Sequence, residues 1–233
     1  MEALILAGGL GTRLASVVRD RAKPVADVAG EPFLAHVLRH LERFRELRRV
    51  ILCVGHRAAS VESALGKRFG RLPLAYSHEG NPLGTAGAIR NALRQHELRA
   101  PALALNGDTY FPIALDKLVA FHRAARLPAT LAAARVAESG RFGSLRLDGA
   151  RVAGFEEKGA QGSGWINGGV YVLGAKALEG IHRGPPVSSL ERDVLPTLAA
   201  SGQLAAYRSR ARFIDIGIPS DYARARLSFD RTG

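Results

Sequence analysis

Residues 3–25, ALILAGGLGTRLASVVRDRAKPV, combine a glycine-rich loop with two spaced cations. Arg13 follows the loop directly, and Lys23 comes ten residues later in a Lys-Pro pair. An arginine fork suits two phosphate oxygens, whereas a lysine acts as a point charge. Glycines let backbone N–H groups approach an anion, because no Cβ atom stands in the way. The pattern therefore predicts a site for a phosphorylated ligand. The loop glycines are Gly8, Gly9 and Gly11.

Two familiar phosphate loops do not fit these residues. The Rossmann fingerprint G-x-G-x-x-G fails because Leu14 stands in place of the third glycine, and the second strand ends in Val54-Gly55 rather than in an acid. A P-loop needs Gly-Lys-Ser or Gly-Lys-Thr, which the sequence lacks. Two interpretations remain: a tight structural turn, or another kind of nucleotide loop whose following helix adds its positive end.

A carboxylate follows a hydrophobic run in two places. Asp108 ends ALALNGD, and Asp215 lies in RFIDIG. A carboxylate at the end of a buried strand is costly unless a cation balances it. Mg²⁺ can do so, because it binds one or two carboxylates together with phosphate oxygens. Asp108 is therefore a candidate metal ligand, with a turn-capping aspartate as the alternative.

The segment HEGNPLGTAGA, residues 78–88, raises the question of which base is bound. Guanine presents N1–H and its N2 amino group as adjacent donors, which one carboxylate accepts together. Uracil and thymine present one donor between two carbonyls, and an unmatched pairing of this kind is costly. Glu79 therefore favours guanine, unless it is a solvated loop charge. Gly84 and Gly87 at a helix start indicate close backbone approach to the base or ribose.

Short apolar runs and helical patterns must position these residues. Strands are predicted at 3–7, 50–55, 72–77 and 102–106. Helices are predicted at 31–44, 58–69 and 85–96. The alternation of the two predicts a largely parallel sheet covered on both faces.

After residue 128 the pattern changes. Runs separated by short Gly-containing turns predict antiparallel strands at 129–136, 143–149, 151–158 and 166–174. Helices at 175–182 and 188–201, strands at 204–209 and 212–217, and a helix from Ser220 complete the pattern. No linker, repeat or low-complexity tract separates the two parts. We therefore expect a single domain, residues 1–233, with a mixed sheet.

Composition excludes several classes of protein. A chain of 233 residues with 47% hydrophobic residues can bury a substantial core. The net charge of +12 comes from scattered basic residues with 6% aromatics, whereas nucleic-acid binders cluster cations and stacking aromatics. No apolar run approaches the ~20 residues of a membrane helix, and residues 1–9 lack signal-peptide features. The single cysteine, Cys53, allows no internal disulfide. We expect a cytoplasmic protein without nucleic-acid or membrane partners.

The motif Gly-Gly-x-Gly-Thr-Arg-Leu, followed at a distance by Lys-Pro, resembles that of the sugar-1-phosphate nucleotidyltransferases, or nucleotide-sugar pyrophosphorylases. The resemblance spans nearly the whole chain. It implies a Rossmann-like three-layer α/β fold with a mixed, mostly parallel central sheet. It also implies a nucleotide-binding half, residues 1–128, and a sugar-phosphate-binding half, residues 129–233. The segments RDRAKPV, NPLGTAGAI and LNGDTYF resemble the D-glycero-α-D-manno-heptose 1-phosphate guanylyltransferase branch.

The resemblance also assigns roles to residues. Catalysis falls to Arg13 at the triphosphate, Lys23 at the α-phosphate and Asp108, and the Mg²⁺ ligands are Asp108 and Asp215. The implied nucleotide-binding residues are Leu6, Gly8, Gly9, Gly11, Thr12, Glu79, Pro82, Gly84 and Thr85. The implied sugar-phosphate-binding residues are Asn106, Gly143, Glu157, Lys158 and Asn167. For Glu157 and Lys158 a surface ion pair is the alternative.

The implied reaction joins GTP and heptose 1-phosphate into GDP-D-glycero-α-D-manno-heptose and pyrophosphate, for bacterial surface polysaccharide. A mannose-1-phosphate guanylyltransferase and a sugar-1-phosphate uridylyl- or thymidylyltransferase are the enzyme alternatives. A nucleotide-sugar-binding regulatory protein and a basic nucleic-acid-binding module are the alternatives without catalysis. The residues leave open the stereochemistry of the sugar, and they are compatible with both a monomer and a homodimer.

Overall fold

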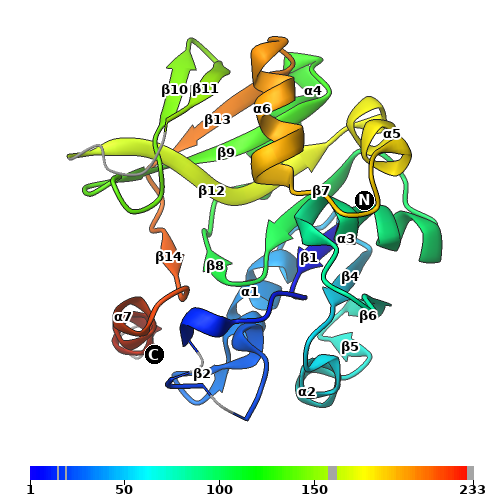
Figure 1. The fold of residues 1–233 in the computed structure, drawn as a ribbon, viewed down its shortest axis with the longest axis vertical. Coiled ribbons are helices and arrows are strands. Elements are labelled where there is room, and N and C mark those ends of the chain that lie inside the picture. The colour runs from blue at the N-terminus through cyan, green and yellow to red at the C-terminus, as the bar shows by residue number, and fades with distance from the viewer. Residues whose placement is uncertain (15, 19, 157–161, 230–233) are drawn as a thin grey trace.

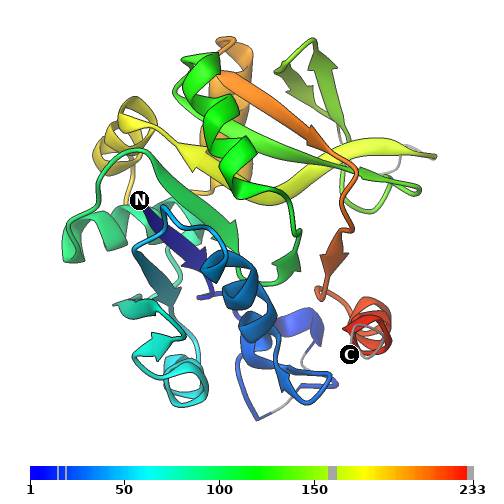
Figure 2. The same ribbon diagram turned by 180° about the vertical axis from the view of Figure 1, so that it is seen from behind.

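The computed structural model describes every residue except 15, 19, 157–161 and 230–233. Its centre is a ten-stranded sheet, seen from opposite sides in Figures 1 and 2. The strands are β1 (Glu2–Leu6), β4 (Arg49–Val54), β5 (Arg68–Phe69), β6 (Leu72–His78), β7 (Ala102–Asn106), β9 (Ala129–Val136), β10 (Leu145–Asp148), β11 (Arg151–Phe155), β12 (Gly164–Leu173) and β13 (Leu204–Ser209). Across the sheet they follow the order β10-β11-β13-β9-β12-β7-β1-β4-β6-β5. β5, β11 and β12 run against the others, which confirms a mixed, mostly parallel sheet.

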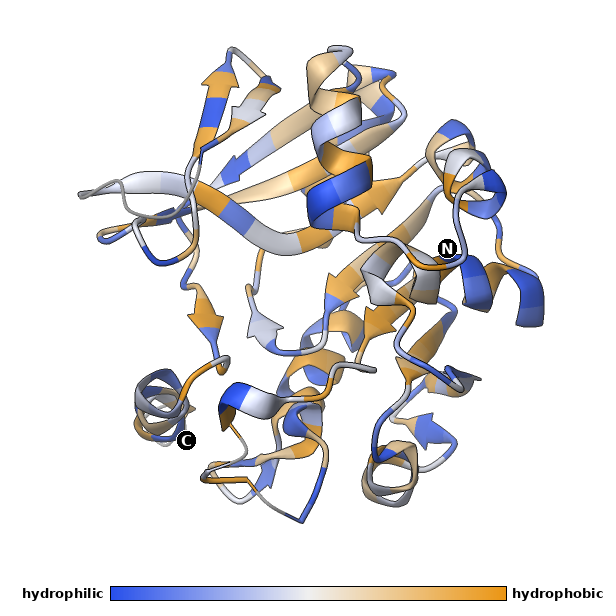
Figure 3. Cartoon of the chain, viewed as in Figure 1, coloured by the Kyte–Doolittle hydropathy of each residue, from blue (hydrophilic) through white to orange (hydrophobic). Residues whose placement is uncertain are grey.

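Helices cover both faces of this sheet, because successive strand residues point to opposite sides. One face carries α1 (Phe33–Glu42), α2 (Ala58–Leu65) and α4 (Leu115–Ala125). The other face carries α3 (Gly84–Gln95), α5 (Ala175–Arg183) and α6 (Leu195–Ala200). In β1, Ile5 packs in the first core and Leu4 in the second. Figure 3 shows hydrophobic residues concentrated on the central strands, and the three-layer α/β fold is thus confirmed.

The predicted elements of the first half agree with the structure. Its four predicted strands are present, with ends within one residue of those expected. Helix α1 buries the apolar residues whose spacing predicted it: Phe33, Leu34, Val37, Leu38 and Leu41. The antiparallel pairing predicted after residue 128 is also present, between β9 and β12 and between β10 and β11. Local periodicity was sufficient for these elements, because each has one face or both faces in a core.

Other segments differ from expectation. The predicted helix 58–69 ends early: α2 stops at Leu65 and Gly66 adopts a φ of +64°, which lets Arg68–Phe69 form β5. Helix α4 lies where no element was predicted. The predicted helix 188–201 begins as a π-helical segment, Leu190–Val194, before α6. The glycine loop leads into a 3₁₀ turn at Thr12–Leu14, and among the residues described after it no α-helix begins before α1.

The order of the strands determines where a ligand can bind. From β1 the chain moves outward through β4 and β6, and it then returns to the other side of β1 to form β7. Loops leaving two such parallel strands diverge at their carboxyl ends and leave a crevice. Leu6 and Asn106 end these strands as register partners. The glycine loop and the Asp108 loop therefore emerge side by side.

Two smaller ladders complete the structure. β2 (Asp27–Val28) pairs with β3 (Glu31–Pro32), and β8 (Thr109–Tyr110) pairs with β14 (Ile214–Asp215). Figure 1 shows β14 descending from the region of the large sheet to α7 (Pro219–Phe229). The ladder of β8 and β14 brings the end of the chain to the crevice. Of the described helices, none has the length and apolarity that crossing a membrane requires.

Candidate active site

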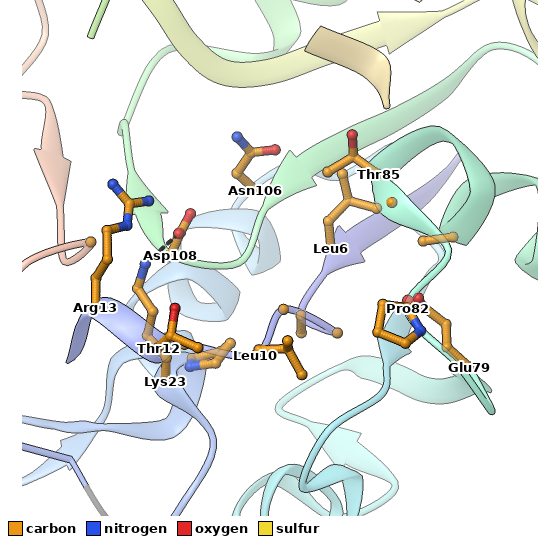
Figure 4. Close-up of a pocket in the computed structure, with 18 residues that line it drawn as sticks. Leu6, Leu10, Thr12, Arg13, Lys23, Glu79, Pro82, Thr85, Asn106 and Asp108 are labelled. Carbon is orange, nitrogen blue, oxygen red and sulfur yellow. Dashed lines mark hydrogen bonds and ion pairs between the residues drawn. The ribbon is translucent and has the colours of Figure 1, made fainter. Parts of the chain in front are cut away.

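A pocket of about 410 Å³ opens where β1 and β7 end (Figure 4). The predicted residues that line it are Leu6, Gly8, Gly9, Gly11, Thr12, Arg13, Lys23, Glu79, Pro82, Gly84, Thr85, Asn106 and Asp108. In Figure 4 Arg13, Lys23 and Asp108 lie at one end, and Glu79 and Pro82 lie at the other. The end with Arg13, Lys23 and Asp108 is here called the cationic end of the pocket. The Glu79 carboxylate lies at the opposite end.

The glycine loop brings bare backbone close to the rest of the site. The Ala7 N–H donates to the Cys53 carbonyl at 2.8 Å, which continues the alignment of β1 beyond Leu6. A Cβ at position 8 would lie 2.5 Å from Glu79 Oε1, and Gly11 has a φ of +64°. In the described part of this segment a three-residue 3₁₀ turn stands in place of the helix expected after the loop, and it aligns too few peptide dipoles to replace one. Any phosphate at this loop must be bound by N–H groups and side-chain cations.

Lys23 and Asp108 form the centre of the cationic end. Lys23 lies in a 3₁₀ turn that continues with Pro24, and its Nζ donates to Asp108 Oδ2 at 2.5 Å. The Lys23 side chain is 10% exposed and that of Asp108 is 35% exposed, so their charges interact in a partly desolvated place. Arg13 is exposed and has no ion-pair or hydrogen-bond partner among the described residues. Its guanidinium is available to an anionic ligand in the pocket.

Asp215 reaches this end through the ladder of β8 and β14. Its register partner is Thr109, and the Ile216 N–H donates to the Asp108 carbonyl at 3.0 Å. Burial, and next the negative charge of Asp108, raise the pKa of Asp215 above its ordinary value, while Lys23 opposes the rise. Asp215 borders an adjoining cavity, whereas Gly217 reaches the pocket.

These two carboxylates fit a divalent cation that phosphate oxygens help to coordinate. The charge of Asp108 disfavours ionisation of Asp215, and a bound cation relieves that repulsion. Among the described residues no group of three or more His, Cys, Asp or Glu side chains could hold a metal by itself. A metal at Asp108 and Asp215 therefore needs oxygens from the ligand to complete its coordination.

Glu79 follows β6 at the other end of the pocket. Its Oε2 accepts a hydrogen bond from the Leu83 N–H at 3.2 Å. Burial raises the pKa of Glu79, against the opposing effect of that hydrogen bond. A half-buried carboxylate of this kind can accept two adjacent donors from a base.

The start of α3 differs from expectation in one respect. A Cβ at Gly84 would lie 2.4 Å from the Ser188 carbonyl oxygen, and one at Gly87 would lie 2.4 Å from that of Pro186. The Ala86 and Gly87 N–H groups also donate to the Ser188 carbonyl. These glycines thus allow close approach of the chain's own segment 186–188, although Gly84 also borders the pocket.

The predicted sugar-side residues are divided between two cavities. Asn106 borders the pocket, and its buried Oδ1 has no hydrogen-bond partner within the described part of the chain. Gly143 and Asn167 border a cavity of about 530 Å³, here called the second pocket. The Asn167 side chain is already engaged, because Nδ2 donates to Tyr171 Oη at 2.8 Å and Oδ1 accepts from the Gly169 N–H at 3.0 Å. Glu157 and Lys158 lie outside the described residues.

Glu191 is a residue of the site that sequence reasoning missed. It borders the second pocket, and its Oε2 accepts from Thr85 Oγ1 at 2.6 Å and from Ser189 Oγ at 3.0 Å. Thr85 borders the first pocket, so this carboxylate connects the two. Glu191 belongs to an ordinary helical pattern in the sequence, and only its π-helical setting marks it as unusual. Ala7, Leu10, Pro24, Ala88 and Gly217 border the first pocket and were also not predicted.

Comparison with known proteins connects this site with nucleotidyl transfer. Residues 2–231 match the nucleotidyl transferase family. The D-glycero-alpha-D-manno-heptose 1-phosphate guanylyltransferase of Aneurinibacillus thermoaerophilus is 38% identical over 97% of this chain and 97% of its own length. The mannose-1-phosphate guanylyltransferase of Mycobacterium tuberculosis is 34% identical over 99% of this chain and 65% of its own length. The crystal structure of HddC from Yersinia pseudotuberculosis complexed with GMP-PN superposes with a TM-score of 0.85 at 36% identity, covering 98% of this chain and 99% of that one.

Proposed function

The chain belongs to the nucleotidyl transferase family, and we propose that it is a D-glycero-α-D-manno-heptose 1-phosphate guanylyltransferase. It converts GTP and the heptose 1-phosphate into GDP-heptose and pyrophosphate. The observation that carries this proposal is the separation of charge in the first pocket. Glu79 lies at one end of it, and Arg13, Lys23 and Asp108 lie at the other. The heptose-specific relative matches over nearly the full length of both chains, which supports the choice of sugar.

Recognition of GTP follows from the chemistry of the two ends. The ionised carboxylate of Glu79 accepts hydrogen bonds from the N1–H and N2 amino groups of guanine, and charge-assisted bonds of this kind are strong. The Leu83 N–H holds one oxygen of that carboxylate in place. The carbonyls of uracil and thymine would face the same negative charge and be repelled. Glu79 therefore selects guanine over the pyrimidine bases.

At the cationic end, Arg13 binds the triphosphate and Lys23 binds the α-phosphate. Asp108 and Asp215 would hold Mg²⁺, with phosphate oxygens of the substrates as further ligands. When bound, Mg²⁺ supplies positive charge that offsets the repulsion between the substrates and the charge developing on the departing pyrophosphate. Lys23 contacts Asp108 at 2.5 Å, so this lysine would hold the α-phosphate beside the carboxylate that would bind Mg²⁺.

The reaction needs positioning more than proton transfer. A phosphate monoester has a second pKa near ~6, so the attacking oxygen of a sugar 1-phosphate is already ionised at neutral pH. No general base is required, and the protein's task is to bring two polyanions into line at the α-phosphorus. Lys158 and Glu157 complete the proposal on the sugar side, with Asn106, Gly143 and Asn167. We also propose cytoplasmic synthesis of GDP-heptose for bacterial surface polysaccharide.

A pyrophosphate-release assay tests this proposal directly. Purified protein with Mg²⁺ is combined with GTP, ATP, UTP or dTTP, and each nucleotide is tested with heptose 1-phosphate, mannose 1-phosphate and glucose 1-phosphate. We expect the highest kcat/KM for GTP with the heptose 1-phosphate. Preference for mannose 1-phosphate, or for UTP or dTTP, would assign the chain to one of the alternative enzymes, and absence of turnover in every combination would leave a binding protein.

A further inference from the structure

Asp221 is a buried carboxylate away from the first pocket. It lies in α7, and its side chain is 5% exposed. Burial acts to raise the pKa of Asp221, but hydrogen bonds from Arg141 and Arg224 outweigh it and hold that pKa below its ordinary value. A buried charge is tolerated only when it is paired in this way.

The two arginines reach Asp221 from different parts of the chain. Arg224 comes from the same helix, one turn later, and its own side chain is 73% exposed. Arg141 comes from the connection between β9 and β10, here called the 138–144 loop. Its Nη1 donates to Asp221 Oδ1 at 3.0 Å, and its Nη2 donates to Oδ2. This two-point contact fixes the orientation of the loop relative to α7 as well as its distance from that helix.

A second contact joins the 138–144 loop to the segment that precedes β14. The ring of Phe142 meets that of Phe213 edge to face, with centroids 5.5 Å apart. The guanidinium of Arg141 also lies 4.7 Å from the centroid of the Phe142 ring. Phe213 precedes Ile214 and Asp215 in the chain. The 138–144 loop therefore packs on the segment that carries the proposed metal ligand.

The other side of the loop forms part of the second pocket. Phe142, Gly143 and Ser144 border that pocket. Gly143 has a φ of +80°, and a Cβ there would lie 2.9 Å from the Glu156 carbonyl oxygen. The Ser144 carbonyl accepts from the Glu156 N–H at 2.8 Å. A displacement of the loop would therefore displace the wall of the second pocket.

We propose that Arg141 and Asp221 are positioning residues that hold the 138–144 loop against α7, beside the Asp215 segment, and so keep the wall of the second pocket in place for the sugar phosphate. The inference rests on the proposed function, because it takes the second pocket as the sugar site. Neither residue touches the nucleotide pocket. We therefore expect the pair to act on sugar 1-phosphate and to leave GTP binding unchanged when it is measured without the Mg²⁺ that Asp215 would help to hold.

The chain offers a matched control for this role. Arg141→Gln and Arg224→Gln each remove one guanidinium from the same carboxylate, but only the first disconnects the loop. We expect Arg141→Gln to raise the KM for sugar 1-phosphate about tenfold or more, since small displacements of binding groups have effects of this size. The Kd for GTP stays within about twofold of the wild type. We expect Arg224→Gln to leave the KM for sugar 1-phosphate and the Kd for GTP unchanged. Asp221→Asn should raise that KM as Arg141→Gln does.

Hydrogen exchange provides a measurement that does not depend on activity. The Ser139 N–H donates to the Gly162 carbonyl, and the Phe142 N–H donates to the Ser139 carbonyl. Exchange of these two amide hydrogens therefore reports opening of the loop. We expect peptides covering 138–144 to exchange about tenfold faster in Arg141→Gln than in Arg224→Gln.

The outcomes separate this inference from the proposed function. Equal KM changes in Arg141→Gln and Arg224→Gln, or equal loss of GTP and sugar-phosphate affinity in Arg141→Gln, would overturn the positioning role. If the wild-type chain releases no pyrophosphate with any substrate pair, the proposed function fails, and exchange still decides whether Arg141 holds the loop. Equal exchange rates of the 138–144 peptides in Arg141→Gln and Arg224→Gln would show that Arg141 does not hold the loop.

Discussion

At the level of single residues, the first pocket separates the Glu79 carboxylate from the cations Arg13 and Lys23. Glu79 lies at one end and Lys23 with Arg13 at the other, while Leu6 occupies the space between them (Figure 4). Guanine carries donors that match the carboxylate, and the triphosphate carries charge that matches the cations. We expect this arrangement to orient GTP in one direction, because the reverse orientation would set phosphate against Glu79.

Removing a charge at the cationic end should reduce turnover. We expect Arg13→Ala and Asp108→Ala each to lower kcat by ~10²-fold or more, because each removes an electrostatic group from the reacting phosphates. Arg21→Ala is the control: Arg21 is on the same segment but pairs with Asp20 outside the pocket. Initial rates of pyrophosphate release measure the effect, and folded Arg13 or Asp108 variants with near-wild-type rates would contradict the assignment.

We expect the raised pKa of Glu79 to make guanine selection depend on pH. In the proposed site the ionised form accepts both guanine donors, so the contribution of Glu79 to GTP affinity should be complete above this pKa and should be lost as pH falls through it. Inosine triphosphate lacks the N2 amino group but carries the same phosphates, so the ratio of the two Kd values cancels phosphate titration. We expect the preference for GTP over inosine triphosphate to decrease as the pH is lowered.

Glu79→Gln should remove this pH dependence and weaken GTP binding about tenfold to a hundredfold, the range for a hydrogen bond to a charged group. Titration calorimetry at several pH values measures both effects. A wild-type ratio that is constant with pH would show that Glu79 does not bind the base.

At the level of elements, α3 links the nucleotide pocket to the chain's second half. Its N-terminal N–H groups are bonded to the Ser188 carbonyl, and Thr85 bonds to Glu191 in the π-helical segment. The start of this helix is thus held by the protein itself. Pro82, Gly84 and Thr85 border the pocket in positions that depend on segment 186–191.

Gly84→Ala tests this dependence. Gly84 has a φ of +75°, and its Cβ would lie 2.4 Å from a backbone oxygen that cannot rotate away. We expect the free energy of unfolding to fall by about 2 kcal/mol, a typical cost of strained backbone, and the KM for GTP to rise. Gly180→Ala in α5 is the control, since no atom lies within 4 Å of its Cβ position and alanine is the better helix former by up to about 1 kcal/mol. Denaturant unfolding measures both, and an equally stable Gly84→Ala variant would contradict the packing argument.

At the level of the whole molecule, the sheet continues across the boundary between the two proposed halves. β7 of the first half pairs with β12 of the second, for example Leu105 with Val170 and Leu103 with Val172. Both hydrophobic cores contain residues from before and after residue 128. Neither half could bury its edge strand alone, so we propose that residues 1–233 form a single domain.

A single domain predicts a single unfolding transition. In calorimetry we expect one peak whose calorimetric and van't Hoff enthalpies agree, and GTP should shift the whole peak to higher temperature. Two transitions, of which only one responds to GTP, would instead indicate separate domains at residues 1–128 and 129–233.

The sequence by itself determined what depends on neighbouring residues. Alternation of apolar and polar residues predicted the strands, helical spacing predicted α1, and the glycine loop with Arg13, Lys23 and Asp108 predicted the chemistry of a phosphate site. These features are local, because each follows from the conformations and side-chain directions of a few consecutive residues.

Only the tertiary structure decided what depends on distant segments meeting. The β8–β14 ladder brings Asp215 beside Asp108, segment 186–188 occupies the space at Gly84 and Gly87, and Arg141 pairs with Asp221. Spacing along the chain carries no information on such contacts. They arise because strand order reverses at β1 and places the loops after β1 and β7 at one crevice, where packing of the whole sheet brings the other segments to them.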